Sequence, residues 1–339
     1  MSTSARSQGR RVTAADIAAE AGVSRATVGF VLNQTPGQTI SARTRDRVLE
    51  AADRLGYRPH VAARALASGR SMIVVHVLPD WPLDHSMRAH LDAASAALNA
   101  AGYTLVSHTP HEDGTTRPLW ETLAPDVVIG MVPFETEDIS AMRASGIRHI
   151  VPAPGVQSPA LEATPFGRGP AMQVEHLVRL GHRRIGFAAT TDARLRALLE
   201  ERVGLAERTA EELGVELFDV EGVGDAERAM LRWRDAGITA VAAYNDEIAA
   251  AVLRAALRAG LRVPEDLSIV GHDDGPFSAL LFPSLTTIRV DTAMIGRFLA
   301  DTALAALGGP EPASLPAKAA TLVVRESTGE APARRLGLA

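Results

Sequence analysis

Residues 13–33 have the pattern of two short helices joined by a tight turn. Thr13 is placed to cap the first helix, Gly22 to end it, and Ser24 to cap the second. In both helices apolar residues recur at helical spacing, which gives each helix one buried stripe. Two helices in this arrangement can present the second one to the major groove of DNA. The pattern therefore predicts a helix-turn-helix unit.

A third helix is predicted over residues 41–56, and its buried face carries Val48, Ala52 and Leu55. These helices lie in a basic segment, because residues 1–70 contain 11 arginines against 5 acidic residues. The complete chain has 35 basic and 40 acidic residues, so the rest of it is acidic overall. This charge distribution indicates that the basic N-terminal segment binds a polyanion, whereas the acidic remainder of the chain would be repelled by the same polyanion.

A short alanine-rich segment follows the third helix, after Pro59. It predicts a helix of about two turns, which would be only marginally stable by itself because helices shorter than ~12 residues are poorly stable in water. Such a segment can form or melt, and so can relay a change between two domains. The alternative is an ordinary linker.

From residue 71 apolar strand-like runs alternate with helical stretches such as 87–101 and 247–259. The runs are 72–78, 103–107, 126–130, 148–151, 184–188, 215–219, 238–243 and 267–271. This alternation indicates parallel sheets with helices on both faces, and two sets of about four strands favour two lobes. Two last runs, 285–290 and 321–325, are spaced to cross back between the lobes. The expected fold class is α/β, with an all-α helix-turn-helix domain and hinge helix before a two-lobed core of two parallel, doubly wound sheets.

The composition excludes several kinds of chemistry. The 339 residues include no cysteine, which rules out disulfides and thiolate catalysis. The sequence has no apolar run of ~18 residues and no signal-peptide pattern, so we expect a cytoplasmic protein with no membrane partner. It has no nucleophile elbow, phosphate-binding glycine loop or zinc-binding helix motif, and the segment from His108 to Asp113 fits a solvated loop better than a metal cluster. We therefore expect no enzyme activity, no cofactor and no metal.

Ordered motifs run along residues 11–328. In the N-terminal part they are Val12-Thr13, Asp16-Ile17-Ala18, Ala21-Gly22-Val23-Ser24, Thr27-Val28, Val31-Leu32-Asn33, Thr44-Arg45, Leu55-Gly56-Tyr57 and Ala63-Arg64-Ala65-Leu66. In the body they include Leu78-Pro79-Asp80, Gly181-His182-Arg183-Arg184-Ile185, Tyr244-Asn245-Asp246, the stretch from Gly260 to Asp274, and Pro283-Ser284-Leu285-Thr286-Thr287-Ile288. In this order the motifs closely resemble those of the lactose-repressor (LacI/GalR) family of transcription regulators.

The resemblance implies a domain order and a set of partners. The implied parts are a DNA-binding domain over 11–58, a hinge helix or linker over 59–70, a first core lobe over 71–170 with a return segment at about 289–312, a second core lobe over 171–288 with a terminal segment at about 313–328, and a loose tail over 329–339. The core of this family has the periplasmic-binding-protein fold. The implied partners are a double-stranded DNA operator, a small-molecule effector (a sugar or another metabolite) and a second copy of the chain, as a homodimer and possibly a tetramer. Operator binding would associate the protein with the nucleoid.

The resemblance also makes residues 24–33 the recognition helix and about 60–68 the hinge helix. The candidate DNA contacts are Thr13, Ser24, Arg25, Ala26, Thr27, Phe30, Asn33 and the hinge residue Leu66, whose counterpart in the family wedges into the minor groove. Where the family commonly has Thr-Val-Ser-Arg, this chain has Thr-Val-Gly29-Phe30. Phe30 can contact a thymine methyl group but cannot donate a hydrogen bond, so Arg25 becomes the best base reader.

Ligands of open α/β lobes bind at the carboxyl ends of the strands. The candidate effector contacts are Asp273, Asn245 and Arg202, together with Trp81 and Met87 from the loop after the first strand. Asp273 and Asn245 each follow a predicted strand directly. The family pattern around Arg202 is degraded, so Arg194 or Arg196 are alternatives to it. Relatives often have Asn-Pro-Phe-Phe in the first loop, and the loss of these aromatics here predicts a changed ligand.

The predicted function is a ligand-responsive regulator that binds a pseudo-palindromic operator as a dimer and acts as a repressor. The alternative is a cytoplasmic sensor that binds a small molecule and whose DNA-binding role is altered or lost, which the replacement at Gly29-Phe30 favours. A third class, an enzyme on the same fold, has no sequence motif in its support.

Overall fold

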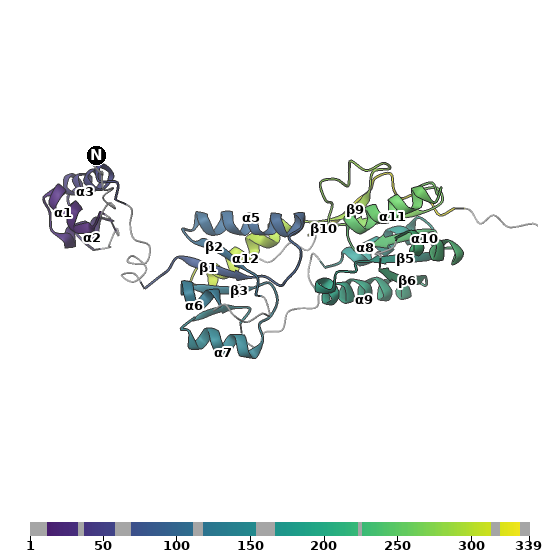
Figure 1. Ribbon diagram of the computed structural model, residues 1–339, viewed down its shortest axis with the longest axis horizontal. Helices are drawn as coiled ribbons and strands as arrows, with labels where there is room; N and C mark the ends of the chain where they lie inside the picture. Colours follow the sequence, from purple (N-terminus) through teal and green to yellow (C-terminus); the bar gives the residue numbers. More distant parts are fainter. Residues whose placement is uncertain are drawn as a thin grey trace, which may run out of the picture. The chain divides into compact units, whose positions relative to one another are not determined.

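The computed structural model describes residues 12–32, 37–57, 69–110, 118–153, 167–222, 226–312 and 319–332 (Figure 1). The chain forms two compact units, Met1–Met72 and Ile73–Ala339. Among the described residues no helix is long and apolar enough to cross a membrane. The candidate contacts Asn33 and Leu66, and with Leu66 the expected hinge helix, lie outside the described residues.

The described part of the first unit contains three helices. They are α1 (Ala14–Ala21), α2 (Arg25–Leu32) and α3 (Ala42–Arg54). Their caps follow the predicted chemistry: Ser24 Oγ accepts a hydrogen bond from the Thr27 backbone N–H at 3.0 Å, and Gly22 closes α1 in the left-handed region at φ 62°. The helices enclose a core of Ile17, Ala18, Ala21, Val28, Val31, Val48, Ala51 and Ala52. The predicted three-helix module with a helix-turn-helix is confirmed.

The first lobe of the second unit has a four-stranded parallel sheet in the order β2-β1-β3-β4. The strands are β1 (Ile73–Val77), β2 (Thr104–His108), β3 (Val127–Gly130) and β4 (His149–Val151), and the helices are α5 (His85–Ala100), α6 (Leu119–Leu123) and α7 (Thr136–Ala144). On one face of the sheet, Val75 and Val77 pack with Trp120 of α6 and Met142 of α7. Helix α5 covers the other face (Figure 1).

The second lobe has a six-stranded sheet in the order β10-β9-β8-β7-β5-β6. The strands are β5 (Arg184–Ala189), β6 (Glu216–Gly222), β7 (Ala240–Ala243), β8 (Ser268–His272), β9 (Thr286–Val290) and β10 (Ala320–Val323), and the helical elements are α8 (Gly169–Arg179), η2 (Ala193–Leu195), α9 (Arg196–Glu212), α10 (Ala226–Asp235) and α11 (Asp246–Arg258). Alternate residues of β7 and β8 enter different cores: Val241 and Ile269 pack under α10 and α11, whereas Val270 packs under α8 and α9. A sheet buried on both faces explains why these strands appear in the sequence as continuous apolar runs.

The last part of the chain contributes elements to both lobes. The runs expected to cross back, 285–290 and 321–325, become β9 and β10, which pair antiparallel within the second sheet. The return segment expected at about 289–312 contains α12 (Thr292–Ala306), which packs along α5. This contact is close, since a β-carbon at Gly296 would collide with the carbonyl oxygen of His90. Glycine at this position therefore sets the separation of the two helices.

Candidate DNA-binding and effector sites

One face of α2 is buried and the other is exposed. Val28 and Val31 point into the core of the first unit. Arg25, Ala26 and Phe30 are exposed, and Phe30 is 36% exposed although it is an aromatic residue. Phe30 therefore lies on the outside of the helix and not among the buried residues of this core.

The hydroxyl groups at the start of the helices take part in the caps. Thr13 Oγ1 donates to the Asp16 carboxylate at 2.7 Å, and the hydroxyls of Ser24 and Thr27 lie 2.9 Å apart in a mutual hydrogen bond. The hydroxyl groups of these three candidate contacts therefore each have a hydrogen-bond partner within their own cap. The structure places Thr13, Ser24, Arg25, Ala26 and Phe30 on the surface and Thr27 half-buried.

The basic charge of the first unit stays available for a polyanion. Arg54 is paired with Glu20 at 3.3 Å and with Glu50 at 3.8 Å. Four other arginines are exposed and form no ion pair with any described residue: Arg25, Arg43, Arg45 and Arg47. Unpaired guanidinium groups on a small helical unit can neutralise phosphates, which supplies the sequence-independent part of DNA affinity.

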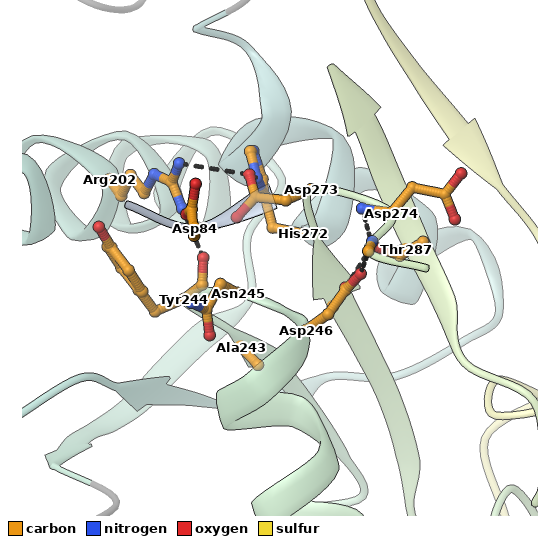
Figure 2. A network of polar contacts seen from close by, with 12 residues as sticks. Asp84, Arg202, Ala243, Tyr244, Asn245, Asp246, His272, Asp273, Asp274 and Thr287 are labelled. Atoms are coloured by element: carbon orange, nitrogen blue, oxygen red, sulfur yellow. Dashed lines mark hydrogen bonds and ion pairs between the residues drawn. The ribbon is translucent and has the colours of Figure 1, made fainter. Parts of the chain in front are cut away.

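In the second lobe, polar side chains gather at the carboxyl ends of β7 and β8 (Figure 2). Asn245 follows β7, and its Oδ1 accepts a hydrogen bond from the Ile248 backbone N–H at 2.9 Å, which caps α11. Asp273 follows β8 with a φ of 98°, in a region that few non-glycine residues adopt. Its Oδ1 accepts a hydrogen bond from His272 Nδ1 at 2.6 Å. Both predicted residues therefore lie at the edge of the sheet where ligands of such folds bind.

Arg202 reaches this edge from α9 and is the arginine that meets Asp273. Its Nη2 lies 3.6 Å from Asp273 Oδ1, its Nη1 donates to the carbonyl oxygen of Tyr244 at 2.6 Å, and its guanidinium carbon is 4.5 Å from the centroid of the Tyr244 ring. The alternative Arg194 is engaged elsewhere, with Asp192 at 2.6 Å. The geometry thus favours Arg202 over Arg194 as the partner of Asp273.

The charges at this edge are set by burial and by each other. Burial opposes ionisation of Asp273, but the neighbouring His272 and Arg202 outweigh it and lower the pKa of Asp273. Burial, with Arg202 beside it, lowers the pKa of His272. At neutral pH the site therefore holds a charged carboxylate, a guanidinium group and a neutral imidazole, which together can accept from and donate to a polar ligand.

Asp246 holds the segments of the site together. Its buried carboxylate accepts hydrogen bonds from the Gly275 backbone N–H at 2.7 Å, from Ser278 Oγ at 2.5 Å and from Thr287 Oγ1 at 2.5 Å. Burial raises the pKa of Asp246, and the hydrogen bonds work in the opposite direction. One side chain thus ties the start of α11 to the segment after Asp273 and to β9.

A second carboxylate anchors the same segment to the last two strands. Asp274 pairs with Arg325 at 2.6 Å and with Arg289 at 2.6 Å, and its side chain is almost fully buried. Burial favours the neutral acid, but the hydrogen bonds from the two arginines prevail and lower the pKa of Asp274. The positions of Asp273 and Asp274 are therefore both determined by contacts with other elements.

A cavity lies against this cluster. Its lining residues are Asp84, His85, Ser86, Asn245, Asp246, Glu247, Asp273 and Gly275. Asp84 comes from the loop before α5, which it caps by accepting from the Met87 backbone N–H at 2.8 Å. Trp81 is half-buried and Met87 is buried in α5, and neither lines this cavity. No group of three or more metal-ligating side chains occurs among the described residues.

Sequence reasoning did not single out Tyr244, His272 or Asp246 as members of the site. All three stand next to residues that it did select, Asn245 and Asp273. The only sequence signal that could have identified them is their position, because residues at the carboxyl end of a strand lie at the same edge of the sheet as their neighbours in the chain.

Two family models match the chain. The model described as "Bacterial regulatory proteins, lacI family" covers residues 13–60, and the one described as "Periplasmic binding protein-like domain" covers residues 174–328. The HTH-type transcriptional regulator MalR of Streptomyces coelicolor is 35% identical over 95% of this chain and 98% of its own length. The lactose operon repressor of Escherichia coli is 28% identical over 86% of this chain and 84% of its own length.

Solved structures give the same result. The crystal structure of the lac repressor dimer bound to operator and the anti-inducer ONPF matches with a TM-score of 0.74 and 25% identity, over 94% of this chain and all of that one. These relatives are named as transcriptional regulators or repressors, not as enzymes. The chain therefore belongs to the lacI family of bacterial regulatory proteins and is a DNA-binding transcription regulator, not an enzyme.

Proposed function

We propose that this regulator is a repressor that binds a pseudo-palindromic operator as a dimer and that a small effector in the core changes its affinity for the operator. The observation that carries the DNA-binding part is the outward face of α2, where Arg25 and Phe30 are exposed beside uncompensated positive charge. The related lac repressor dimer has been crystallised on its operator, which supports the same mode of action for this chain. Operator binding would place the protein at the nucleoid.

In the proposed complex α2 enters the major groove. Arg25 is the side chain that can read a guanine edge, and Ala26 and Phe30 offer apolar contact to thymine methyl groups. Thr13, Ser24 and Thr27 contact phosphates through hydroxyls that the caps hold in place. Asn33 as a further phosphate contact and Leu66 as a minor-groove wedge stay predictions from the sequence.

Replacement of Arg25 by alanine is expected to weaken specific operator binding by about 10- to 100-fold, the loss typical of one base-reading arginine. The measurement is fluorescence anisotropy of the full chain on DNA from upstream of its own gene, at fixed salt. Arg143→Ala is the matched control, because Arg143 is an exposed arginine on α7 of the other unit. Equal losses in the two variants, or no loss for Arg25→Ala, would contradict base reading by α2.

For the effector we propose a polar small molecule, a sugar or another metabolite, that contacts Asp273, Asn245 and Arg202. These residues present an acceptor, an amide and a donor at one edge of the second sheet. Trp81 lies in the loop after β1 and Met87 in the first turn of α5, both in the first lobe, and we keep them as proposed contacts. A thermal-shift screen of metabolites on the full chain tests this, since a ligand raises the melting temperature of the state it binds.

We further propose lobe boundaries that follow the chain crossings. In this proposal the first lobe comprises 71–170 with about 289–312, and the second comprises 171–288 with about 313–328. The packing of α12 on α5 supports the first assignment, and the pairing of β10 with β9 supports the second. Residues 59–70 remain the proposed hinge between the DNA-binding domain and the core.

An exposed apolar patch supports the proposed dimer. Phe282 is 87% exposed and Leu280 is 82% exposed, and both follow the site segment. Beside them a groove of about 380 Å³ is lined by Ala250, Leu253, Arg254, Leu257, Arg258, Leu281 and Phe282. Exposed apolar side chains beside a groove are suited to a protein–protein contact, and a two-fold dimer would bury the same residues on both copies.

Phe282→Glu is expected to weaken the dimer at least 10-fold, because a two-fold interface at this groove would bury both introduced carboxylates among apolar side chains. Sedimentation velocity at micromolar concentration measures the change. Leu83→Glu serves as the control, since Leu83 is 70% exposed on the loop before α5 and outside the groove. A variant that remains dimeric would show that the two copies associate through a different surface.

A further inference from the structure

Two histidines of the first lobe are buried side by side. His76 comes from the middle of β1 and is fully buried, and His90 comes from α5 and is 3% exposed. Their ring centroids are 5.4 Å apart. Both ring nitrogens of His76 and Nε2 of His90 have no hydrogen-bond partner among the described residues. A buried polar group without a partner is costly, so the pair is an unusual feature of an otherwise apolar layer.

Among the described residues no opposite charge lies beside either ring. The buried apolar residues of β1 and α5 in this layer include Val74, Met87, Ala94 and Leu98. The charged and titratable side chains on the elements packed here are His85, Arg88 and Asp92 of α5, Arg297 and Asp301 of α12, His108 of β2, and Asp126 before β3. Those of α5 and α12 are exposed, and Arg88 and Asp92 pair with each other. No described carboxylate lies within ion-pair distance of His76 or His90.

Both imidazole rings of the folded pair are therefore neutral at neutral pH. Burial, with the neighbouring His90, lowers the pKa of His76 to about 3, and burial lowers the pKa of His90 to about 4. In the unfolded chain a histidine has a pKa of about 6.5. Because both folded values lie below the unfolded one, the stability from neutral rings is full above about pH 6.5 and is lost as the pH falls toward 4.

We propose that the His76–His90 pair is a proton-responsive element, in which acidification separates α5 from β1 and loosens the first lobe. Two protonated rings 5.4 Å apart in an apolar layer repel each other and lack counter-ions. Strand β1 starts at Ile73, immediately after the first unit ends at Met72. Loosening of β1 therefore changes the core where the chain passes to the first unit, which carries the proposed DNA contacts. Acidification would then regulate the protein in addition to the effector.

Hydrogen exchange of the full chain, followed by mass spectrometry on peptides from β1 and α5, tests the proposal. Exchange is measured between pH 7 and pH 4.5 and corrected for the intrinsic rate at each pH. Exchange reports the equilibrium constant for local opening of β1 and α5. Each histidine changes this constant by about tenfold per pH unit between pH 6 and pH 4.5, so the pair changes it by about a hundredfold per unit. This contribution adds to the background from other titrating groups.

The variants separate the pair from that background. His76→Val and His90→Leu are each expected to reduce the slope about tenfold per pH unit, and the double variant about a hundredfold, because apolar side chains fill the layer without titrating. His149→Gln on β4 is the control and keeps the wild-type slope. If one single variant fails to fold, the other still decides the question. Equal slopes in wild type and in a folded variant of the pair would overturn the proposal, whether or not the proposed operator is correct.

Discussion

Replacement of Asp246 by alanine is expected to destabilise the second unit by about 3 kcal/mol. The buried carboxylate accepts hydrogen bonds from Gly275, Ser278 and Thr287, and hydrogen bonds to a charged group contribute about 1.5–3 kcal/mol each. Burial of the charged carboxylate is itself unfavourable, as the raised pKa of Asp246 shows. The alanine variant no longer bears this desolvation cost, which offsets part of the loss. The remaining effect is still large, since three donors lose their acceptor in a buried place.

Asp246→Asn is the matched control and is expected to cost about 1 kcal/mol. The amide oxygen can replace Oδ2, which accepts from Gly275 and Ser278, and the amide nitrogen can donate to a rotated Thr287 hydroxyl. Urea unfolding of the full chain, followed through tryptophan fluorescence, gives the two free energies of unfolding. Equal losses for alanine and asparagine would contradict the hydrogen-bonding role given to Asp246.

The second large effect is expected from Ile17→Ala in the first unit. Ile17 is fully buried in a small core to which the described residues contribute eight buried side chains. Loss of a buried isoleucine costs about 2–5 kcal/mol, and a small domain has only a few kcal/mol of stability in total. The variant should therefore unfold residues 12–57 in much of the population and lose operator binding, while the second unit keeps its fold.

Hydrogen exchange resolves the two units in one experiment. Peptides from α1 to α3 should lose protection in Ile17→Ala, and peptides from β5, β7 and β8 should keep theirs. Ala19→Gly, at an exposed position of the same helix, is the control and should cost only about 1 kcal/mol. Loss of protection in both units would contradict their independence.

The elements of this fold were predictable because their signals are local. These signals determine the structure of only a few neighbouring residues. Examples are the capping residues Thr13 and Ser24, the left-handed Gly22 and the apolar runs of the strands. The fate of 285–290 and 321–325 depends on which neighbour each strand pairs with across the sheet. That choice is made by non-local hydrogen bonds, so the antiparallel β9–β10 pair was not foreseen.

The candidate effector site shows the same division. Asp273 and Asn245 could be selected because each follows a strand directly. The choice among Arg202, Arg194 and Arg196 needed the distance from α9 to β8, which no spacing in the sequence gives. The contacts of Asp246 join residues 29 to 41 positions apart, and the His76–His90 pair joins a strand to a helix. Such pairs become visible only when the elements are packed.

The claim that this chain is an operator-binding repressor is tested most directly by specificity at fixed salt. Anisotropy titrations compare a pseudo-palindromic site from upstream of its own gene with a scrambled duplex of equal length and composition. We predict at least 10³-fold tighter binding to the palindrome, the range of specific protein–DNA complexes, and a large loss when one half-site is scrambled. Equal affinity for the two duplexes would contradict the claim.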